Sequence, residues 1–322
     1  MTTYAWMIGA RGLLGSAIST AARRRHSWKV LDAEPLPWGG DRLEAAVGRE
    51  ASRLFEAAAG PGDRWVIVWA AGVAVTSSPQ SAFDHELAEF QLVVDTIAAT
   101  IRVSAAERRG TIFFASSAGG IYGGSERPPF DEHTTPAPIS PYGRFKLAGE
   151  TVLRRLADEL AITVVLGRIA NLYGPGQRLD KMQGLISHLA RAQYSPQPAS
   201  IYVSLDTMRD YIFAKDCGEL ICDVIARSFE EPEPMTVVKN ISSGQAVTIA
   251  DLLGYFRILA KQHPHVMLGS SAAAALQAHD LRLTSTVWPE VDRRDFTPLP
   301  AGIHATMSDL LVAIQAGSTA RP

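Results

Sequence analysis

The sequence has few cysteines and little net charge. Only Cys217 and Cys222 occur among 322 residues, and the formal net charge is −2 with a sequence pI near 6.5. Five residues apart on a helix, the two thiols lie on different faces, which argues against a disulfide framework or a cysteine metal site. The near-neutral charge provides no field that attracts nucleic acid or an anionic membrane. We expect a reducing compartment, no nucleic-acid partner and no bound metal.

Long apolar runs are also missing. No stretch approaches the roughly 20 residues that a membrane-spanning helix needs. Residues 1–8 enter an apolar strand pattern directly, without the charged segment and cleavage site of a secretion signal. With 47% hydrophobic residues, the chain is long enough to bury a core without disulfides. These features predict a cytoplasmic protein with no membrane partner.

What the sequence does contain is an alternation of short apolar runs with helix-length segments. The runs that predict strands lie at 4–8, 28–31, 65–69, 111–115 and 162–168. The segments that predict helices begin near residues 12, 42 and 82, and a further one covers 142–160. Strands and helices that alternate in this way form parallel sheets with helices on both faces. The pattern predicts an α/β fold with a Rossmann-like, doubly wound parallel sheet.

After residue 168 this alternation stops. Proline and glycine clusters interrupt the chain at 173–177, 194–198 and 230–234. We therefore expect a sheet domain over 1–168 and a smaller α+β lobe over 169–322, some segments of which return to the sheet.

A glycine loop follows the first predicted strand. In MIGARGLLGSAI, Gly9, Gly12 and Gly15 lie between that strand and the start of a helix, which is the context of a dinucleotide-binding loop. Glycine lets the backbone approach a pyrophosphate, and the helix N-terminus offers free N–H groups to it. Tight strand-to-helix turns use glycine without a ligand too, so the position after the first strand is what favours binding.

Two charged residues favour different dinucleotides. Asp32 ends the second predicted strand, where a carboxylate can bind both ribose hydroxyls and repel a 2′-phosphate, which favours NAD. Arg11 lies in the glycine loop, where a guanidinium can pair with a 2′-phosphate or stack on adenine. The balance favours NAD over NADP. The plain alternative for Asp32 is a solvated polar residue at a strand end.

The stretch SPYGRFKLAGE combines a helix start with a tyrosine and a lysine. Ser140 is a favourable N-cap and Pro141 suits the first helical position, so Tyr142 is predicted in the first turn. Lys146 follows four residues later, on the same helix face. A phenol titrates near pH ~10, and a nearby cation favours the phenolate that accepts a proton. The pair indicates either acid–base chemistry or a decorated helix surface.

Ser117 is predicted to lie near this pair. The run FFASSAGGIYGG ends a buried strand with two serines at the carboxyl edge of the sheet, where open α/β sheets bind ligands. Ser117 can then hydrogen-bond the substrate oxygen whose proton Tyr142 takes. The structural alternative is that Ser117 caps a turn and Tyr142 packs on the sheet.

In these motifs the sequence resembles the extended short-chain dehydrogenase/reductases, and within them the NAD-dependent epimerase/dehydratase family acting on nucleotide sugars. The similar stretches follow the family's order between residues 9 and 253: GARGLLG, SSAGGIYGG, DEHTTPAPISPYGRFKLAGE, GRIANLYGPGQ, MRDYIFAKDC and NISSGQAVTIADLL. The resemblance implies that residues 1–168 bind NAD(P) and carry the chemistry, and that 169–322 mostly bind substrate. It also implies a homodimer, formed through the helices at 82–102 and from Tyr142.

The resemblance also gives each site residue a role. The catalytic residues are Ser117, Tyr142 and Lys146. The cofactor-binding residues are Gly9, Arg11, Gly12, Leu13, Leu14, Gly15, Asp32, Ala70, Ala71, Gly72, Tyr142 and Lys146. The substrate-binding residues are Ser117, Asn171 and Arg209, the last two at the nucleotide diphosphate. The plain alternative for Arg209 is an ion pair with Asp210 or Asp216.

Two departures from the family pattern bear on the reaction. The loop AGGIYGG has no carboxylate, whereas the family's dehydratases and decarboxylases place acids there, so elimination and decarboxylation are disfavoured. Glu89 stands where many relatives have an asparagine, in a part of the cofactor site.

The expected function is an NAD(P)-dependent epimerase that oxidises and re-reduces C4 of a nucleoside-diphosphate sugar. One alternative is an NAD(P)H-dependent 4-keto-sugar nucleotide reductase, which uses the same three residues. Another is a non-catalytic NAD(P)-sensing regulator, against which Tyr142 and Lys146 count. Residues between Gln177 and Tyr202 are expected to select the sugar.

Overall fold

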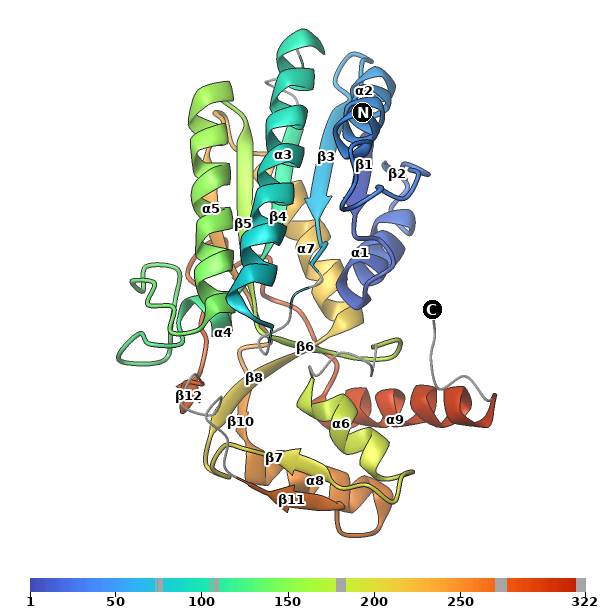
Figure 1. Ribbon diagram of the computed structural model, residues 1–322, viewed down its shortest axis with the longest axis vertical. Coiled ribbons are helices and arrows are strands. Elements are labelled where there is room, and N and C mark those ends of the chain that lie inside the picture. Colours follow the sequence, from blue (N-terminus) through green and yellow to red (C-terminus); the bar gives the residue numbers. More distant parts are fainter. Residues whose placement is uncertain are drawn as a thin grey trace.

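The computed structural model describes residues 1–72, 74, 78–104, 106, 110–177, 184–269 and 277–316. A helix-covered sheet forms one body, and a smaller lobe lies at the carboxyl ends of its strands (Figure 1). Part of the segment expected to select the sugar, residues 178–183, lies outside the described residues.

Within the described residues the main sheet is parallel, in the order β2-β1-β3-β4-β5-β9. Its strands are β1 (Thr3–Ile8), β2 (Trp28–Val30), β3 (Arg64–Trp69), β4 (Gly110–Ser117), β5 (Thr163–Ile169) and β9 (Thr236–Ile241). The chain runs from β1 outward to β2 and then continues on the other side of β1 with β3. Open α/β sheets bind ligands at such a reversal, beyond the carboxyl ends of the strands. The predicted Rossmann-like doubly wound fold is confirmed.

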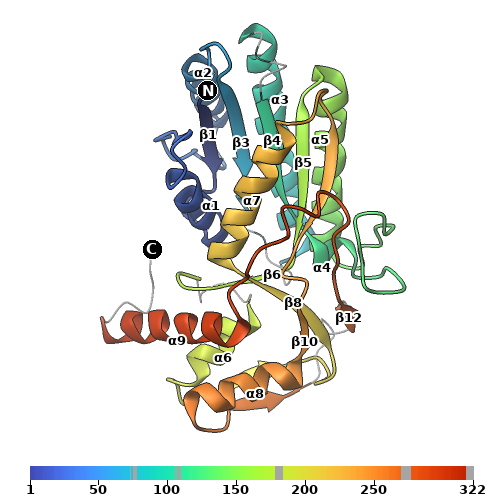
Figure 2. The same cartoon turned by 180° about the vertical axis from the view of Figure 1, so that it is seen from behind.

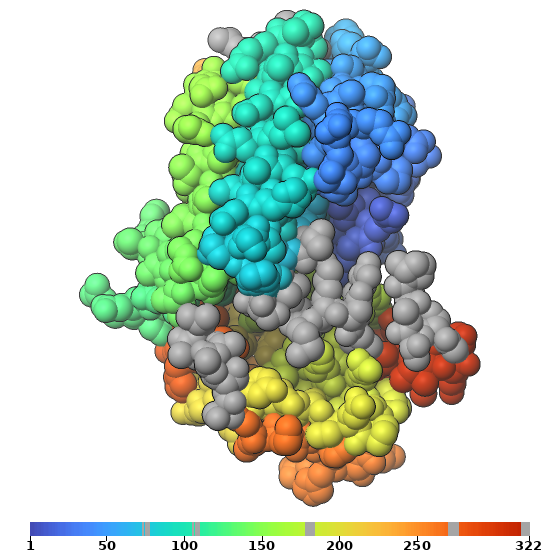
Figure 3. All heavy atoms as spheres, viewed as in Figure 1, coloured from blue at the N-terminus to red at the C-terminus, as the bar shows by residue number. Residues whose placement is uncertain are grey.

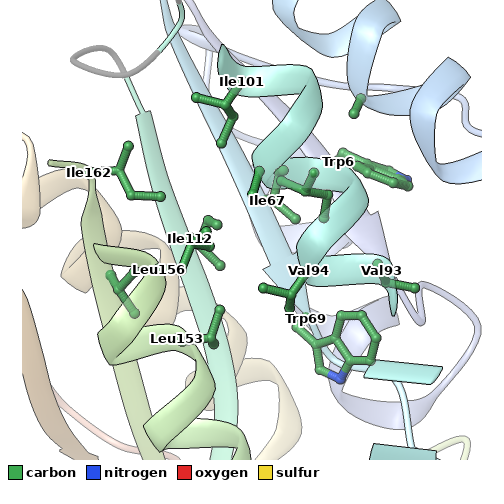
Figure 4. Packing of buried hydrophobic residues seen from close by; sticks show 14 of the residues in the cluster. Trp6, Ile67, Trp69, Val93, Val94, Ile101, Ile112, Leu153, Leu156 and Ile162 are labelled. Carbon is green, nitrogen blue, oxygen red and sulfur yellow. The ribbon is translucent and has the colours of Figure 1, made fainter. Parts of the chain in front are cut away.

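Helices cover both faces of this sheet. One face carries α2 (Leu43–Ala57), α3 (Gln80–Ser104) and α5 (Pro141–Leu160), and the other carries α1 (Leu13–Arg23) and α7 (Ala214–Ser228) (Figures 1 and 2). Successive strand residues point to opposite faces, so Ile67 packs under α2 and α3 while Val66 and Val68 belong to the core under α1 and α7. Figure 4 shows Trp6, Ile67 and Trp69 in the first of these cores.

The strands predicted before residue 168 are confirmed to within two residues at their ends, and the predicted helices begin within two residues of the observed ones. The prediction did not identify β9, whose sequence TVVKNI lies inside the irregular region. It pairs with β5 from Val164 to Ile169 and extends the sheet by one strand. Residues 236–241 therefore belong to the main sheet.

The smaller lobe is organised around β8 (Met208–Phe213). Its other elements are β6 (Asn171–Tyr173), α6 (Leu185–Ala192), β7 (Ala199–Ile201), β10 (Ala246–Thr248), α8 (Ile249–Ala260), β11 (Val266–Leu268), β12 (Asp280–Leu281) and α9 (Leu299–Gln315). Strand β8 pairs with β6, β10 and β12, while β7 pairs with β11. None of the helices in the described ranges combines the length and apolarity required to span a bilayer.

Candidate active site

The glycine loop joins β1 to α1 at the reversal of the sheet. Gly9 has φ +93°, and a Cβ there would lie 2.5 Å from the backbone nitrogen of Ala71. A Cβ on Gly15 would lie 2.1 Å from the carbonyl oxygen of Gly9. The protein's own packing therefore requires glycine at both positions. The loop lies directly against Ala70 and Ala71, which follow β3.

Gly12 differs from these two glycines. Its φ of −75° suits any residue, and a Cβ would meet only the Gly9 carbonyl oxygen, at an ordinary 3.5 Å. As the N-cap of α1 it gives no side-chain bond to the first turn, which Leu13 and Leu14 begin. Packing gives no reason for a glycine here, whereas a phosphate approaching the helix N-terminus does. The loop therefore fits the pyrophosphate of a dinucleotide.

Asp32 lies two residues beyond the end of β2 and is exposed. Its carbonyl oxygen accepts a bond from Arg53 Nη2 on α2 at 3.2 Å, and Arg53 Nη1 is held by Glu50 at 2.7 Å. Arg11 is also exposed. Neither the Asp32 carboxylate nor the Arg11 guanidinium is engaged in an ion pair within the described part of the chain, so both are open to a ligand.

The start of α5 has the predicted form. Ser140 Oγ accepts a hydrogen bond from Gly143 N at 3.0 Å, and Pro141 is the first helical residue. Tyr142 follows in the first turn. Lys146 is buried, and its Nζ donates to the Ala115 carbonyl at 2.9 Å and lies 5.7 Å from the centroid of the Tyr142 ring. The structure therefore places the phenol and the ammonium together at the carboxyl end of β4.

Two glycines bring Ser117 toward Tyr142. The short helix α4 (Ala118–Ile121) begins directly after Ser117. A Cβ on Gly143 would lie 2.1 Å from the Gly120 carbonyl oxygen, and a Cβ on Gly120 would lie 3.2 Å from the Tyr142 ring. The absence of both side chains lets α4 approach α5 backbone to backbone.

Ser117 itself caps α4. Its Oγ accepts a hydrogen bond from Gly120 N at 3.2 Å, so the turn-capping alternative is observed. A hydroxyl both donates and accepts, and the cap uses only an acceptor site. The hydroxyl proton can still be donated to a substrate oxygen.

A second Tyr-x-x-x-Lys pair, Tyr211 and Lys215, lacks this geometry. Tyr211 is a strand residue of β8, and burial raises its pKa to about 12. Lys215 lies at the start of α7, is exposed, and pairs with Glu219 at 3.4 Å. Because the pair spans a strand-to-helix junction, the two residues do not share one helix face.

A buried ion pair that sequence reasoning missed supports α5. Glu150, one turn after Lys146, accepts bonds from Arg168 Nε at 3.0 Å and Nη2 at 2.8 Å, and from Ser116 Oγ at 2.6 Å. Burial alone lowers the pKa of Arg168, but the hydrogen bonds and charge of Glu150 raise it above its usual value. Lys146 and Glu150 thus fix consecutive turns of α5 to consecutive residues of β4. The signal was the glutamate in KLAGE, which lies on the same helix face as Lys146.

Carboxylates beside α4 are occupied. Asp131 accepts from Thr134 N at 2.9 Å in its own turn. Glu132 accepts from Asn240 N at 2.9 Å and from Ser285 Oγ at 2.5 Å. These bonds hold loops together, so neither acid is placed as a free proton donor.

Arg209 and Asn171 come together in the lobe. The pairing of β6 with β8 places Asn171 opposite Tyr211, and Asn171 Nδ2 donates to the Asp210 carbonyl at 2.9 Å. Arg209 is buried, and its Nη1 donates to the Met208 carbonyl at 2.8 Å and the His279 carbonyl at 3.4 Å. Burial lowers its pKa.

The alternative of an ion pair for Arg209 is wrong for both proposed partners. Asp210 accepts from Ser243 N at 2.9 Å, and Asp216 accepts from Thr297 N at 2.6 Å. Among the described residues Arg209 forms no ion pair with a carboxylate, although the charge of Asp280 on β12 opposes the effect of burial on its pKa. A buried guanidinium that bonds only carbonyls still carries a charge that an anion can neutralise.

A short segment joins this arginine to the α4 helix. In β12, Leu281 pairs with Arg209 of β8, and the Leu281 side chain would lie 3.4 Å from a Cβ on Gly119. Ser117, Tyr142 and Lys146 therefore form one cluster, Asn171 and Arg209 form a second, and β12 lies between them.

Glu89 is a residue of α3, and Gly72 lies beside the same helix. Glu89 Oε1 accepts a bond from Gly39 N at 2.6 Å, in the loop that follows Asp32. A Cβ on Gly72 would lie 3.2 Å from Glu86 Oε1. The carboxylate of Glu89 thus has a definite backbone partner in the loop between β2 and α2.

Comparison with known proteins now identifies the family. The sequence profile of the "NAD dependent epimerase/dehydratase family" matches residues 5–238. The chain belongs to this family. A dTDP-4-dehydro-6-deoxyglucose reductase of Escherichia coli is 36% identical over 143 residues, which are 44% of this chain and 43% of that protein. A dTDP-L-rhamnose 4-epimerase of Burkholderia thailandensis is 34% identical over 124 residues, covering 38% of this chain and 32% of that protein.

The matches thus span less than half the length of either curated relative. Among solved structures, MoeE5 in complex with UDP-glucose and NAD gives a TM-score of 0.76 at 22% identity, covering 98% of this chain and 100% of that chain. This similarity supports the fold of both the sheet body and the lobe.

Proposed function

We propose that the chain is an NAD(P)-dependent enzyme that oxidises and re-reduces the C4 hydroxyl of a nucleoside-diphosphate sugar, as an epimerase. The observation that carries this proposal is the buried Lys146, held on the Ala115 carbonyl beside the Tyr142 ring at the carboxyl end of β4. A cation next to a phenol in this position suits proton transfer from a sugar hydroxyl.

The chain's own residues divide the work as follows. Tyr142 takes the proton of the C4 hydroxyl during oxidation and returns a proton during reduction. Ser117 donates a hydrogen bond to the same oxygen, and Lys146 places its positive charge beside the phenol. A bound nicotinamide dinucleotide supplies the hydride acceptor and donor. The loop of Gly9, Gly12 and Gly15 would hold its pyrophosphate, and Ala70 to Gly72 would line its path.

The lobe would hold the substrate. Arg209 fits the diphosphate, because it is buried and bonds no carboxylate among the described residues, and Asn171 lies beside it. The sheet body would therefore bind the cofactor and the lobe the nucleotide sugar. The fixed bonds of Asp131 and Glu132, and the lack of an acid in 118–124, count against elimination.

A 4-keto-sugar nucleotide reductase is the second candidate. It is favoured by the similarity to the reductase of Escherichia coli, and it uses the same tyrosine as proton donor. The two reactions differ in one respect: an epimerase regenerates its cofactor in each cycle, whereas a reductase consumes NADH or NADPH.

We also propose a homodimer formed through α3 and α5. Figure 3 shows the two helices side by side on the surface of the sheet body. A groove of about 220 Å³ lies between them, and Leu92 of α3 is 39% exposed.

Both cysteines are free and buried. The cytoplasmic location stays a prediction.

The test begins with protein purified without added cofactor, whose bound nucleotide is identified by chromatography after denaturation. Cofactor-loaded protein is then incubated with UDP- and dTDP-hexoses, and the products are separated while absorbance is followed at 340 nm. Epimer formation without net absorbance change supports the epimerase. Consumption of reduced cofactor by a 4-keto sugar supports the reductase. Cofactor binding with no turnover of any nucleotide sugar would overturn both and favour the sensing regulator.

A further inference from the structure

The sheet has an unusually short first half. The standard doubly wound order is 3-2-1-4-5-6, with three strands in each half. Here β2 is the edge strand beside β1, and the described chain runs from β2 to α2 without forming a further strand. Residues 31–42 form a loop in place of the third strand, and the predicted ribose ligand Asp32 lies near the start of this loop.

Two contacts fix the far part of this loop. The indole of Trp38 packs edge to face on Trp69, the last residue of β3, with centroids 6.0 Å apart and planes at 81°. Gly39, at φ +72°, donates its N–H to Glu89 Oε1 at 2.6 Å. Pro35 and Pro37 restrict the backbone just before the indole. Trp38 is therefore held against the carboxyl end of β3, the strand that leads into Ala70.

Trp38 is the exception among the tryptophans. It is 42% exposed, whereas the other five, all within the described residues, are at most 9% exposed. A perpendicular ring pair covers at most one face of an indole, so the second face is free of Trp69. A partly exposed indole that is held on Trp69, directly before the Ala70 and Ala71 that pack on Gly9, suits a flat ligand.

On the basis of the proposed function, we infer that Trp38 stacks on the adenine of NAD(P), and that Glu89 is a positioning residue that holds Trp38 for this contact. The loop would then bind the ribose with Asp32 at its start and the base with Trp38 six residues later. Every base has a π face, so indole stacking does not depend on adenine's hydrogen-bonding groups. It also does not distinguish NAD from NADP.

The test uses two fragments of the cofactor. ADP-ribose carries the adenine and the pyrophosphate, and nicotinamide mononucleotide carries neither adenine nor its ribose. Their affinities are measured by calorimetry for the wild type, Trp38→Ala, Glu89→Ala and Glu89→Gln, each checked by its thermal melt. Ile258→Ala is the control, since Ile258 is an apolar residue of α8 with 69% exposure that lies outside the segment expected to select the sugar.

We expect Trp38→Ala to weaken ADP-ribose binding by at least about fivefold, the lower limit for losing one base–aromatic stack. The affinity of Trp38→Ala for nicotinamide mononucleotide, and that of the Ile258→Ala control for ADP-ribose, should change by less than about twofold. Glu89→Ala should weaken ADP-ribose binding in the same direction, and Glu89→Gln should restore it, because the amide oxygen still accepts from Gly39 N. ADP-ribose should also protect the wild type from acrylamide quenching, since Trp38 is the accessible tryptophan.

Other results would separate the two claims. Unchanged ADP-ribose affinity in folded Trp38→Ala overturns the stacking inference and leaves the proposed function standing. Equal losses of affinity for ADP-ribose and nicotinamide mononucleotide also overturn it, because they indicate a general loosening of the loop. A folded wild type that binds neither NAD, NADP nor ADP-ribose overturns the proposed function and this inference with it.

Discussion

The two clusters of the candidate active site are built in different ways. Tyr142 and Lys146 lie one turn apart on a single helix, which is pressed onto α4 through the backbones of Gly120 and Gly143. Arg209 and Asn171 come from strands separated along the chain and meet through the pairing of β6 with β8. The first cluster depends on glycines, whose lack of a side chain lets the backbones of α4 and α5 pack closely. The second depends on a buried charge and the polar groups around it.

This difference predicts different weaknesses. The tyrosine cluster should be sensitive to added volume, because no space exists between α4 and α5 for even a methyl group. The arginine cluster should be sensitive to changes in charge and in protonation, because Arg209 and the neighbouring Asp210 are buried. The following predictions address each cluster in turn.

Gly143→Ala should have the largest effect. Its Cβ would lie 2.1 Å from the Gly120 carbonyl oxygen, so α4 must move away from α5, at a cost of about 3 kcal/mol in the free energy of unfolding. The matched control is Gly254→Ala in the middle of α8, where a Cβ meets nothing within 4 Å. That change should stabilise the protein by about 0.5–1 kcal/mol. Chemical denaturation measures both, and equal stabilities would contradict the packing account of the tyrosine cluster.

Arg209→Lys keeps the positive charge of the second cluster and removes the guanidinium, which can donate two hydrogen bonds to one phosphate group. We expect KM for the nucleotide sugar to rise by roughly thirtyfold, since bidentate contact with phosphate is lost. The Kd for NAD should be unchanged, because the proposed cofactor site lies with Ser117, Tyr142 and Lys146, and β12 separates these residues from Arg209. Steady-state kinetics and calorimetry separate the two quantities. A change confined to NAD binding would move Arg209 out of the proposed diphosphate site.

Asp210 should make stability depend on pH. Burial raises its pKa from the usual value near 4 to about 6, although hydrogen bonds from Ser243 lower it. Because the folded-state pKa is the higher one, the folded state binds the proton more tightly. This contribution to stability is present below pH ~4 and is lost as the pH rises through about 6. Between pH 4 and 7, the wild type should lose about 2 kcal/mol of unfolding free energy relative to Asp210→Asn. A constant difference between the two proteins over this range would show that Asp210 is not shielded as described.

Gly12→Ala tests the glycine loop, because this glycine lies near a proposed ligand and not near closely packed backbone. The variant should melt like the wild type and bind NAD about tenfold more weakly. Gly15→Ala is the contrasting change, since its Cβ would lie 2.1 Å from the Gly9 carbonyl oxygen and should lower the melting temperature. If Gly12→Ala were destabilised and bound NAD normally, the pyrophosphate assignment would be wrong.

The sequence predicted the parts of the fold that depend on neighbours along the chain. Alternating apolar runs identified the strands up to 168, and Ser140 and Pro141 fixed the start of α5. The strand β9 was missed because its short apolar run lies among prolines and glycines, and only its pairing with β5 makes it part of the sheet.

The contacts within the site were harder to predict. Spacing alone placed Lys146 beside Tyr142, but it could not show that Lys146 bonds the Ala115 carbonyl, because β4 is about 30 residues away. The same holds for Glu150 and Arg168, which meet only when α5 packs on β5. Arg209 was found through family resemblance, and its lack of an acidic partner became visible only in the folded chain.

The role of Tyr142 as proton donor is tested by comparing Tyr142→Phe with the wild type. Cofactor-loaded protein is mixed with a panel of UDP- and dTDP-hexoses, and the rate of product formation and the Kd for NAD are both determined. The account predicts a rate lower by about 10²–10⁴, because the proton donor is lost, with NAD affinity within a few-fold of the wild type. A Tyr142→Phe protein that turns over as fast as the wild type would contradict the assignment of this tyrosine.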